Sequence, residues 1–423
     1  MEQVDLLILN ASQVCVIPSE HGGPQRGSGL GELGLVENGA VAVKNGRIHH
    51  TGPTTDLQTR YTAVQTIDAN GRAVIPGFVD PHTHLPWFGD RAHEFEMRLA
   101  GASYMEIMAA GGGIMNTVRQ ARQASIDDLV ADNLPRLQRM LAHGTTSTEA
   151  KTGYGLDTAT EIKLLDAMLA LHAVQPVEIT PTFLPAHAVP AEYQGRTNEY
   201  VDLVINDMLP AGAEWMTQHH IQLFFDVFCE AGVFDVPQTR RMMETAVTLG
   251  YRLKIHADEF EGLGGTKLAV ELGAVSADHL VKTPDADIAA LGQGQTIAVG
   301  LPGTPFGLGH QEYTPAKKIL AGGGALALAT DLNPGTCWCE SMQMVIALAC
   351  RYMGLTQAQA LAAATLNAAH AIGRGHEIGS LEPGKQADIL ILDTPDYRQL
   401  GYRFGTNLVN TVIKKGKVTI NNE

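Results

Sequence analysis

Several histidines of the chain follow short apolar runs, and two of them stand two positions apart. His82 and His84 close the run AVIPGFVDPHTH. In an extended backbone such residues point to the same side, about 6.5–7 Å apart, so both imidazoles can bind one metal ion at ~2.0–2.1 Å. The other candidate ligands that end apolar runs are His187, His256, His279 and Asp331. These residue types predict a metal site that activates water for hydrolysis.

Each of these residues also has a simpler interpretation. An isolated His-x-His pair is often only an exposed strand. His256 follows a strongly apolar run, where a hydrogen-bonded core histidine is common, and Asp331 precedes Asn and Pro, a sequence typical of a helix N-cap. A buried charge or imidazole costs several kcal/mol unless it is paired or bound to a metal. Six such residues in one core therefore favour the metal site.

Eight short apolar segments alternate with helical patterns such as 126–142, where leucines recur at helical spacing. This alternation predicts parallel βα units. An open doubly wound sheet also alternates, but the number eight and the chain length favour a closed (β/α)8 TIM-like barrel, in which site residues stand at the carboxyl ends of the strands. The predicted strands are 73–84, 144–151, 177–187, 221–230, 251–259, 274–280, 295–303 and 325–335.

Both ends of the chain are predicted to form β structure. The first seventy residues contain short alternating strands, and the last fifty contain ADILILD and a hairpin around Lys415-Gly416. Because a closed barrel returns the chain to its starting point, the two ends can form one small β-sandwich domain. We predict this domain over 1–72 and 376–423, and the catalytic α/β barrel over 73–375.

The composition limits the class of protein. The 423 residues are 45% hydrophobic and 18% charged, with a net charge of −15, which is typical of a globular chain that binds neither nucleic acid nor acidic membranes. No run reaches the ~20 apolar residues of a membrane helix, and no basic leader begins the chain. The five cysteines are odd in number and scattered, which argues against a disulfide framework. The pair Cys337 and Cys339 lacks a second pair to complete a thiolate metal site. We therefore expect a cytoplasmic enzyme.

Longer motifs make the prediction more specific. The runs PGFVDPHTH, GDRAHEFEMRLAG, GYGL, AHAVP, DVFCE, HADE, GAVSADHL, ATDLNPGT and IGSLEPGKQADILILD resemble the imidazolonepropionase family of the amidohydrolase superfamily. The resemblance runs from about residue 70 to the C-terminus. The His-x-His and Thr-Asp motifs indicate only the superfamily, whereas GDRAHEFEMRLAG together with DLNPGT is far more specific.

The resemblance implies a ligand set and a substrate site. One divalent metal, zinc or iron, is expected on His82, His84, His256 and Asp331. Substrate contacts are expected from Arg91, Tyr154, His187, Glu259, Asn333, Gly335 and Thr336. The relatives suggest a homodimer. The sequence departs from the family pattern at Lys151-Thr152 and at Pro185, and the latter affects the loop that carries His187.

The reaction implied by the resemblance is the addition of water to a small molecule, 4-imidazolone-5-propanoate, which opens the ring amide and gives N-formimidoyl-glutamate. Asp331 would be the general base, and His279 would hydrogen-bond the attacked oxygen or the water. Glu259 would exchange a proton with a ring nitrogen. Arg91 would bind the propanoate with its planar fork, although an ion pair with Glu94 at a helix start is an alternative interpretation.

Three other readings stay open. The predicted fourth strand ends without the lysine that bridges two metals in hydantoinase-like relatives, which favours one metal, but Glu230 stands there and can also bind metal. A deaminase of the same superfamily, acting on a heterocyclic amine, would have the same ligands. A catalytically silent barrel is disfavoured because all four ligands, His279 and Glu259 are present.

Overall fold

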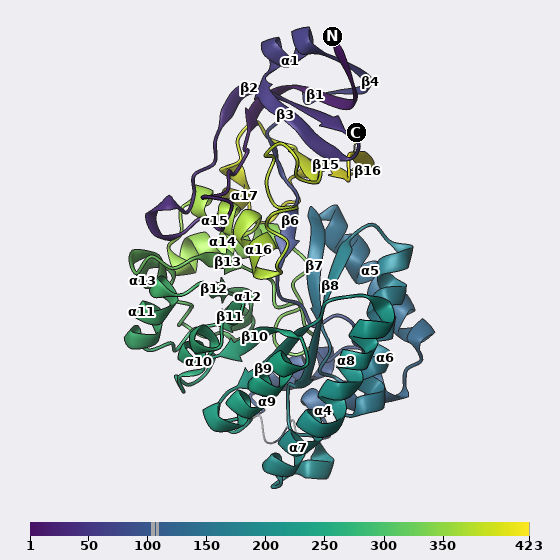
Figure 1. The fold of residues 1–423 in the computed structure, drawn as a ribbon, viewed down its shortest axis with the longest axis vertical. Coiled ribbons are helices and arrows are strands. Elements are labelled where there is room, and N and C mark those ends of the chain that lie inside the picture. The colour runs from purple at the N-terminus through teal and green to yellow at the C-terminus, as the bar shows by residue number, and fades with distance from the viewer. Residues whose placement is uncertain (103–105, 107–109, 423) are drawn as a thin grey trace.

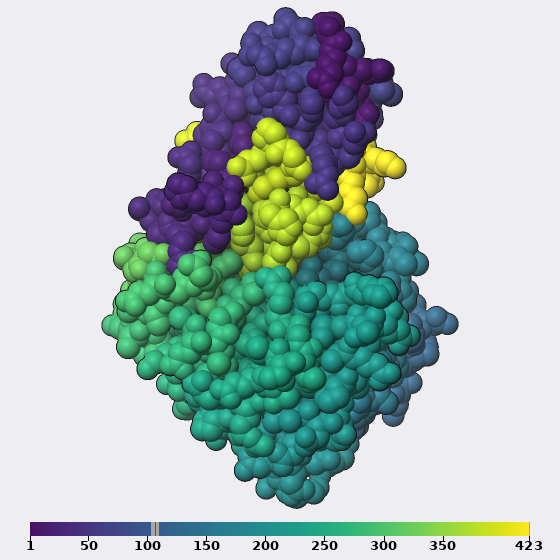
Figure 2. Space-filling model, in the orientation of Figure 1, coloured from purple at the N-terminus to yellow at the C-terminus, as the bar shows by residue number. Residues whose placement is uncertain are grey.

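The computed structural model describes residues 1–102, 106 and 110–422. Figure 1 shows a barrel of strands surrounded by helices, with a smaller β part joined to one end. In the space-filling view the two chain ends form this smaller part together (Figure 2). No helix among the described residues is long and apolar enough to cross a membrane.

The predicted eight-stranded parallel barrel is confirmed. Its strands are hydrogen-bonded in chain order, and the circle is completed by a parallel bridge between Thr83 and Leu332. The backbone N–H of Asp331 also donates to the carbonyl of His82, at 3.1 Å. This closure brings the ends of the first and last strands together. The strands are β6 (Phe78–Asp80), β7 (Thr145–Lys151), β8 (Glu178–Ala186), β9 (Phe224–Cys229), β10 (Arg252–Ala257), β11 (Ser276–His279), β12 (Ile297–Gly300) and β13 (Leu326–Leu328).

The helices cover the outside of the barrel, as an amphipathic pattern requires. The predicted helix 126–142 is α5, where the Ser125 hydroxyl caps the N–H of Asp128 and Leu129, Leu137 and Met140 are buried. The others that accompany the barrel are α2 (Ala92–Leu99), α4 (Ile114–Gln123), α6 (Thr158–Val174), α7 (Thr197–Leu203), α8 (Leu209–His219), α9 (Val236–Thr248), α10 (Gly265–Glu271), α11 (Asp285–Gln293), α12 (Gly303–Leu308), α13 (Ala316–Ala321), α14 (Met342–Leu348), α15 (Gln357–Ala363) and α16 (Leu366–Ala371).

Strands from both chain ends share the terminal sheet, as predicted. Its order is β16-β15-β14-β5-β1-β2-β3, with β4 beside β1. Residues from early and late strands, such as Ile8, Val41 and Ile389, lie in one hydrophobic cluster. The elements are β1 (Glu2–Val14), β2 (Val36–Lys44), β3 (Arg47–Pro53), α1 (Thr54–Arg60), β4 (Tyr61–Asp68), β5 (Val74–Pro76), β14 (Ile389–Leu392), α17 (Gln399–Tyr402), β15 (Val409–Lys414) and β16 (Lys417–Asn421).

The segment predicted as one strand over 73–84 is two strands. Its first part, β5, pairs with β1 and β14 in the terminal sheet, and its second part, β6, pairs with β7 in the barrel. Gly77 separates them, where an added Cβ would lie 2.4 Å from the Thr146 hydroxyl. The domain boundaries at 72/73 and 375/376 stay predictions.

An ion cluster joins the terminal sheet to the barrel. The ammonium group of Lys414 on β15 donates to Glu178 on β8 at 2.8 Å and to Asp388 at 2.7 Å, and all three side chains are largely buried. Burial alone would raise the pKa of Glu178, but Lys414 and Arg374 hold that pKa well below its ordinary value. The carboxylate is therefore stabilised in the folded state, and this contribution is lost as the pH falls below about 4.5.

We predict that Lys414→Met lowers the free energy of unfolding by about 3–5 kcal/mol, because the buried Asp388 loses its cation and Glu178 keeps only Arg374 and Lys415. The measurement is the midpoint of chemical denaturation at neutral pH. The matched control is Lys417→Met on the neighbouring strand, where the lysine is exposed, and its midpoint should stay unchanged. Equal midpoints for the two variants would show that the cluster does not hold the two sheets together.

Candidate metal centre

Four ligand atoms converge at the carboxyl ends of the barrel strands. His84 Nε2 lies 3.3 Å from His82 Nε2 and 3.5 Å from His256 Nε2. Asp331 Oδ1 lies 3.3 Å from His84 Nε2 and 3.5 Å from His82 Nε2. All four residues are buried. The strand ends therefore bring the predicted ligands together.

The spacing and donor types fit one divalent ion. Ligands at ~2.0–2.1 Å around a tetrahedral zinc are about 3.3–3.4 Å from one another, close to the distances in the cluster. Asp331 Oδ1 is buried and has no hydrogen-bond partner among the described residues, while the Thr304 hydroxyl donates to Oδ2. Burial lowers the pKa of the imidazoles, to about 3 for His84 and about 4 for His256. They are thus neutral, which metal binding requires.

Two buried aspartates orient the imidazoles. Asp278 Oδ2 lies 2.7 Å from His82 Nδ1, across the barrel from β6, and the Ser276 hydroxyl donates to its other oxygen. Asp226 Oδ2 lies 3.0 Å from His256 Nδ1 on the adjacent strand. The hydrogen bond on His82 Nδ1 fixes the ring orientation and the tautomer, so that Nε2 points at the metal position, and Asp226 makes an ionic contact beside Nδ1 of His256. Sequence reasoning missed both aspartates.

Behind the aspartates, two lysines fill the barrel interior. Lys151 donates to Asp226 at 2.8 Å and to Glu149 at 2.6 Å. Lys254 lies 3.9 Å from Asp278 and 3.7 Å from Glu149. All five side chains are buried. Lys151 is thus committed to carboxylates of the interior, which explains its place at the end of β7.

His187 and Tyr154 form one wall beside the cluster. The ring of His187 is stacked on that of His84, with centroids 4.8 Å apart, and its Nδ1 lies 3.0 Å from the Gly153 carbonyl. The Tyr154 ring lies 5.4 Å from that of His187. Tyr154 is buried. The carboxylate of Glu161 holds this loop by accepting the N–H groups of Gly153, Gly155 and Leu156.

Arg91 makes the ion pair that its alternative interpretation predicted. Its Nε donates to Glu94 at 2.8 Å. Glu94 also accepts the N–H of Gly113, at 3.1 Å. The outer edge of the guanidinium still faces the loop after β13, because an added Cβ at Gly335 would lie 2.5 Å from Arg91 Nη1. The ion pair with Glu94 therefore orients the guanidinium group and leaves its outer edge directed at the loop after β13.

Glu259 and His279 stand next to one another near Asp331. Glu259 Oε2 lies 3.6 Å from His279 Nδ1. Burial, Asp331 and Glu230 raise the pKa of Glu259 well above its ordinary value, which favours the protonated form of this carboxyl. His279 can also join His82 and Asp331 around an ion.

Glu230 lies outside both ligand groups found in the described part of the chain. Its carboxylate accepts backbone N–H groups from Ala231, Glu259, Phe260 and Glu261, at 2.9–3.1 Å. Its lone pairs are therefore used by the loop that carries Glu259. This arrangement favours the single-metal interpretation over a glutamate ligand.

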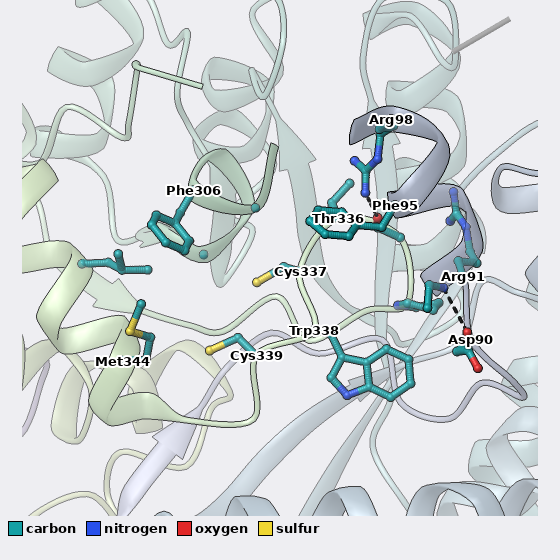
Figure 3. Close-up of a pocket in the computed structure, with 16 residues that line it drawn as sticks. Asp90, Arg91, Phe95, Arg98, Phe306, Thr336, Cys337, Trp338, Cys339 and Met344 are labelled. Carbon is teal, nitrogen blue, oxygen red and sulfur yellow. Dashed lines mark hydrogen bonds between the residues drawn. The ribbon is translucent and has the colours of Figure 1, made fainter. Parts of the chain in front are cut away.

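The loop after β13 is a turn built on Asn333. The side-chain oxygen of Asn333 accepts the N–H groups of Gly335 and Thr336, both at 2.8 Å, and its amide donates to the Asp331 carbonyl at 2.7 Å. Gly335 and Thr336 border a pocket of about 700 Å³ that Arg91 also lines (Figure 3). The N-cap interpretation of Asp331 is wrong, because the next helix, α14, begins after Ser341, whose hydroxyl caps it.

The fold and the cluster define the class of protein. The model of the Amidohydrolase family matches residues 73–419. Among solved structures, an adenosine deaminase from Xanthomonas campestris with bound zinc has a TM-score of 0.72 and 22% identity, over 100% of this chain and 94% of that chain. Guanine deaminase of E. coli also has a TM-score of 0.72, at 14% identity over 99% of each chain. At these identities the likeness concerns the fold.

Sequence relatives narrow the class. The chain is 53% identical to an imidazolonepropionase of Herpetosiphon aurantiacus, over 100% of this chain and 99% of the relative. It is 48% identical to one of Chloroflexus aggregans over the full length of both, and 46% identical to one of Geobacillus kaustophilus over 98% of both. The chain therefore belongs to the amidohydrolase family and, within it, to the imidazolonepropionases.

We predict that Asp278→Asn weakens metal binding about 10- to 100-fold, because an amide holds the His82 ring less firmly than a carboxylate does. The measurement is the metal dissociation constant from competition with a chromogenic chelator. The matched control is Asp287→Asn on α11, a carboxylate that hydrogen-bonds the N–H of Lys267 outside the barrel interior. Equal metal affinities of the two variants would show that Asp278 does not stabilise the metal site.

Proposed function

We propose that the chain hydrolyses the ring amide of 4-imidazolone-5-propanoate and gives N-formimidoyl-L-glutamate, a step of histidine degradation. The observation that carries the proposal is the cluster of His82, His84, His256 and Asp331, with ligand atoms 3.3–3.5 Å apart in a chain 53% identical to an imidazolonepropionase. These residues would hold one divalent ion, Zn²⁺ or iron. When bound, such an ion polarises the ring carbonyl and lowers the pKa of its water from ~15.7 toward ~7.

Two residues would move protons during the reaction, and a third would stabilise the attacked oxygen. Asp331 is the general base, since Oδ1 is directed into the cluster while Thr304 holds Oδ2. Water adds to the ring carbonyl carbon, and the bond from that carbon to the ring nitrogen breaks. His279 is neutral because burial lowers its pKa to about 3, so it donates a hydrogen bond to the attacked oxygen. Glu259, whose raised pKa favours its protonated form, supplies the proton of the leaving nitrogen.

The surrounding residues would orient the substrate. Arg91 binds the propanoate through the outer edge of its guanidinium. His187 and Tyr154 pack against the imidazolone ring from the side of β7 and β8, where they already lie against His84. The turn of Asn333, Gly335 and Thr336 lies against Arg91. The side chain of Asn333 holds this turn, and Gly335 and Thr336 present it to the substrate.

The setting of the enzyme follows from its chemistry. A small-molecule substrate, an acidic surface and five unpaired cysteines suit a cytoplasmic enzyme without nucleic acid or membrane partners. We propose a homodimer as the assembled form.

A deaminase of heterocyclic amines is the second candidate function. Solved deaminases share the fold at 14–22% identity, so the fold alone does not separate the two reactions. The outer edge of Arg91, directed at the Gly335 turn, favours a substrate with a carboxylate and hence the ring-opening reaction.

We predict that the purified protein consumes freshly generated 4-imidazolone-5-propanoate, and that a chelator abolishes this activity. The measurement is loss of the ultraviolet absorbance of the substrate, with N-formimidoyl-glutamate identified by mass spectrometry. Re-addition of Zn²⁺ or Fe²⁺ in separate samples should restore the rate and indicate the preferred ion. If metal-loaded protein leaves this substrate intact but releases ammonia from a heterocyclic amine, the deaminase reading replaces the proposal.

We predict that Arg91→Lys raises KM about 10- to 100-fold, since a charged hydrogen bond to the propanoate contributes about 1.5–3 kcal/mol. Metal content should stay at the wild-type level, because Arg91 lies outside the ligand groups. The control is Arg240→Lys on α9, which pairs with Glu271 on the surface. A wild-type KM in Arg91→Lys would show that another group binds the carboxylate.

A further inference from the structure

Two cysteines that the proposed reaction does not use follow the substrate turn. Cys337 is buried and Cys339 is partly buried, and one residue separates them in the chain. Both sulfurs lie on the same side of the loop in Figure 3, toward Phe306 and Met344. Two cysteines that share one side of a loop at this spacing can form a disulfide once their side chains turn toward one another.

The pair can be reached from solvent. Both cysteines line the pocket of about 700 Å³, whose other walls are mostly apolar. Phe306 and Trp338, which also line it, are 50% and 46% exposed, so the pocket reaches the surface. A small uncharged reagent can therefore enter and contact the thiols.

The position of Cys337 is tied to the metal centre. Its Sγ donates to the Thr330 carbonyl at 3.2 Å, immediately before Asp331 in the chain. The sulfur also packs against α12, because an added Cβ at Gly303 would lie 2.5 Å from it, and the next residue, Thr304, binds Asp331. The Cys337 carbonyl accepts the N–H of Asn333 at 2.9 Å, which closes the turn. A displaced Cys337 would therefore displace both the turn and the support of Asp331.

We propose that Cys337 and Cys339 are a thiol-oxidation site that takes a hydroperoxide and closes to an intrachain disulfide, which loosens the substrate turn. The sulfur of Cys339 attacks one peroxide oxygen, the O–O bond breaks, and a sulfenic acid and an alcohol or water form. The sulfur of Cys337 then attacks the sulfenic sulfur, the S–O bond breaks, and water leaves. The thiols lose two protons and two electrons, which reduce the peroxide.

The environment assigns the order of attack. Cys339 is the more accessible of the two. The neighbouring Cys337 thiol lowers the pKa of Cys339, whereas Cys339 and burial raise the pKa of Cys337. Cys339 is therefore the peroxide-reactive thiol and Cys337 the resolving one.

The test uses metal-loaded protein treated with hydrogen peroxide. We expect loss of two hydrogens by intact mass, one peptide that contains the linked pair, and loss of two titratable thiols. The consequence for catalysis rests on the proposed function: kcat/KM should fall by about 10- to 100-fold, as expected for a displaced substrate loop, and dithiothreitol should restore it.

Variants separate this site from other oxidation. Cys339→Ser should keep its mass and its activity under peroxide, whereas Cys350→Ser, in the turn after α14, should respond as the wild type does. Peroxide inactivation of Cys339→Ser, or absence of the linked peptide from the wild type, would overturn the site. A linked pair with unchanged kcat/KM would overturn its coupling to the turn. If the untreated enzyme does not hydrolyse 4-imidazolone-5-propanoate, the proposed function fails, while the mass measurement still decides the thiol site.

Discussion

The site depends on the orientation of imidazole rings inside a closed barrel. An imidazole presents two nitrogens, and a metal can be bound only if one nitrogen of each ring points inward. Asp278 hydrogen-bonds His82 from another strand of the barrel, and Asp226 lies beside His256 on the adjacent strand. Closure of the barrel between Thr83 and Leu332 then brings Asp331 to the same point. Without closure, the ligands at the first and last strands would not meet.

The buried carboxylates behind the histidines need nearby positive charge, because the barrel interior is shielded from water. Three buried carboxylates, those of Glu149, Asp226 and Asp278, face the two ammonium groups of Lys151 and Lys254, and a fourth buried carboxylate, Asp80, accepts hydrogen bonds from Thr330. Burial raises the pKa of Asp278 to about 6 and that of Asp80 to about 7. The interior thus carries more acidic than basic groups, which suits a divalent cation at its end.

The sequence predicted the architecture because eight apolar segments alternate with helical ones, and polar residues end those segments. The strand ends predicted six candidate residues, and the family resemblance implied the four of them that meet in the cluster. The pairing of His82 with Asp278 could not be predicted, because 196 positions separate them and only barrel closure makes them neighbours. For Lys151 and Lys254 the sequence offered one indication that they lie inside the barrel. Each is a charged residue in a predicted strand, two positions from another polar residue. The break at Gly77 was missed because 73–84 is apolar on both sides of it.

The loops around the cluster are held by the framework and depend little on one another. Buried carboxylates of Glu94, Glu161 and Glu230 each accept backbone N–H groups of one loop. These loops carry or orient Arg91, Tyr154 and Glu259. His279 and Asp331 have φ values of 79° and 56°, a conformation that non-glycine residues adopt only where the surroundings enforce it. The strands fix the ligand cluster, and each loop is anchored separately. The residues of one loop can therefore change while the ligands stay in place. Solved deaminases share this fold at 14–22% identity, and in the proposed function Arg91, which lies outside the cluster, would bind the carboxylate of the substrate.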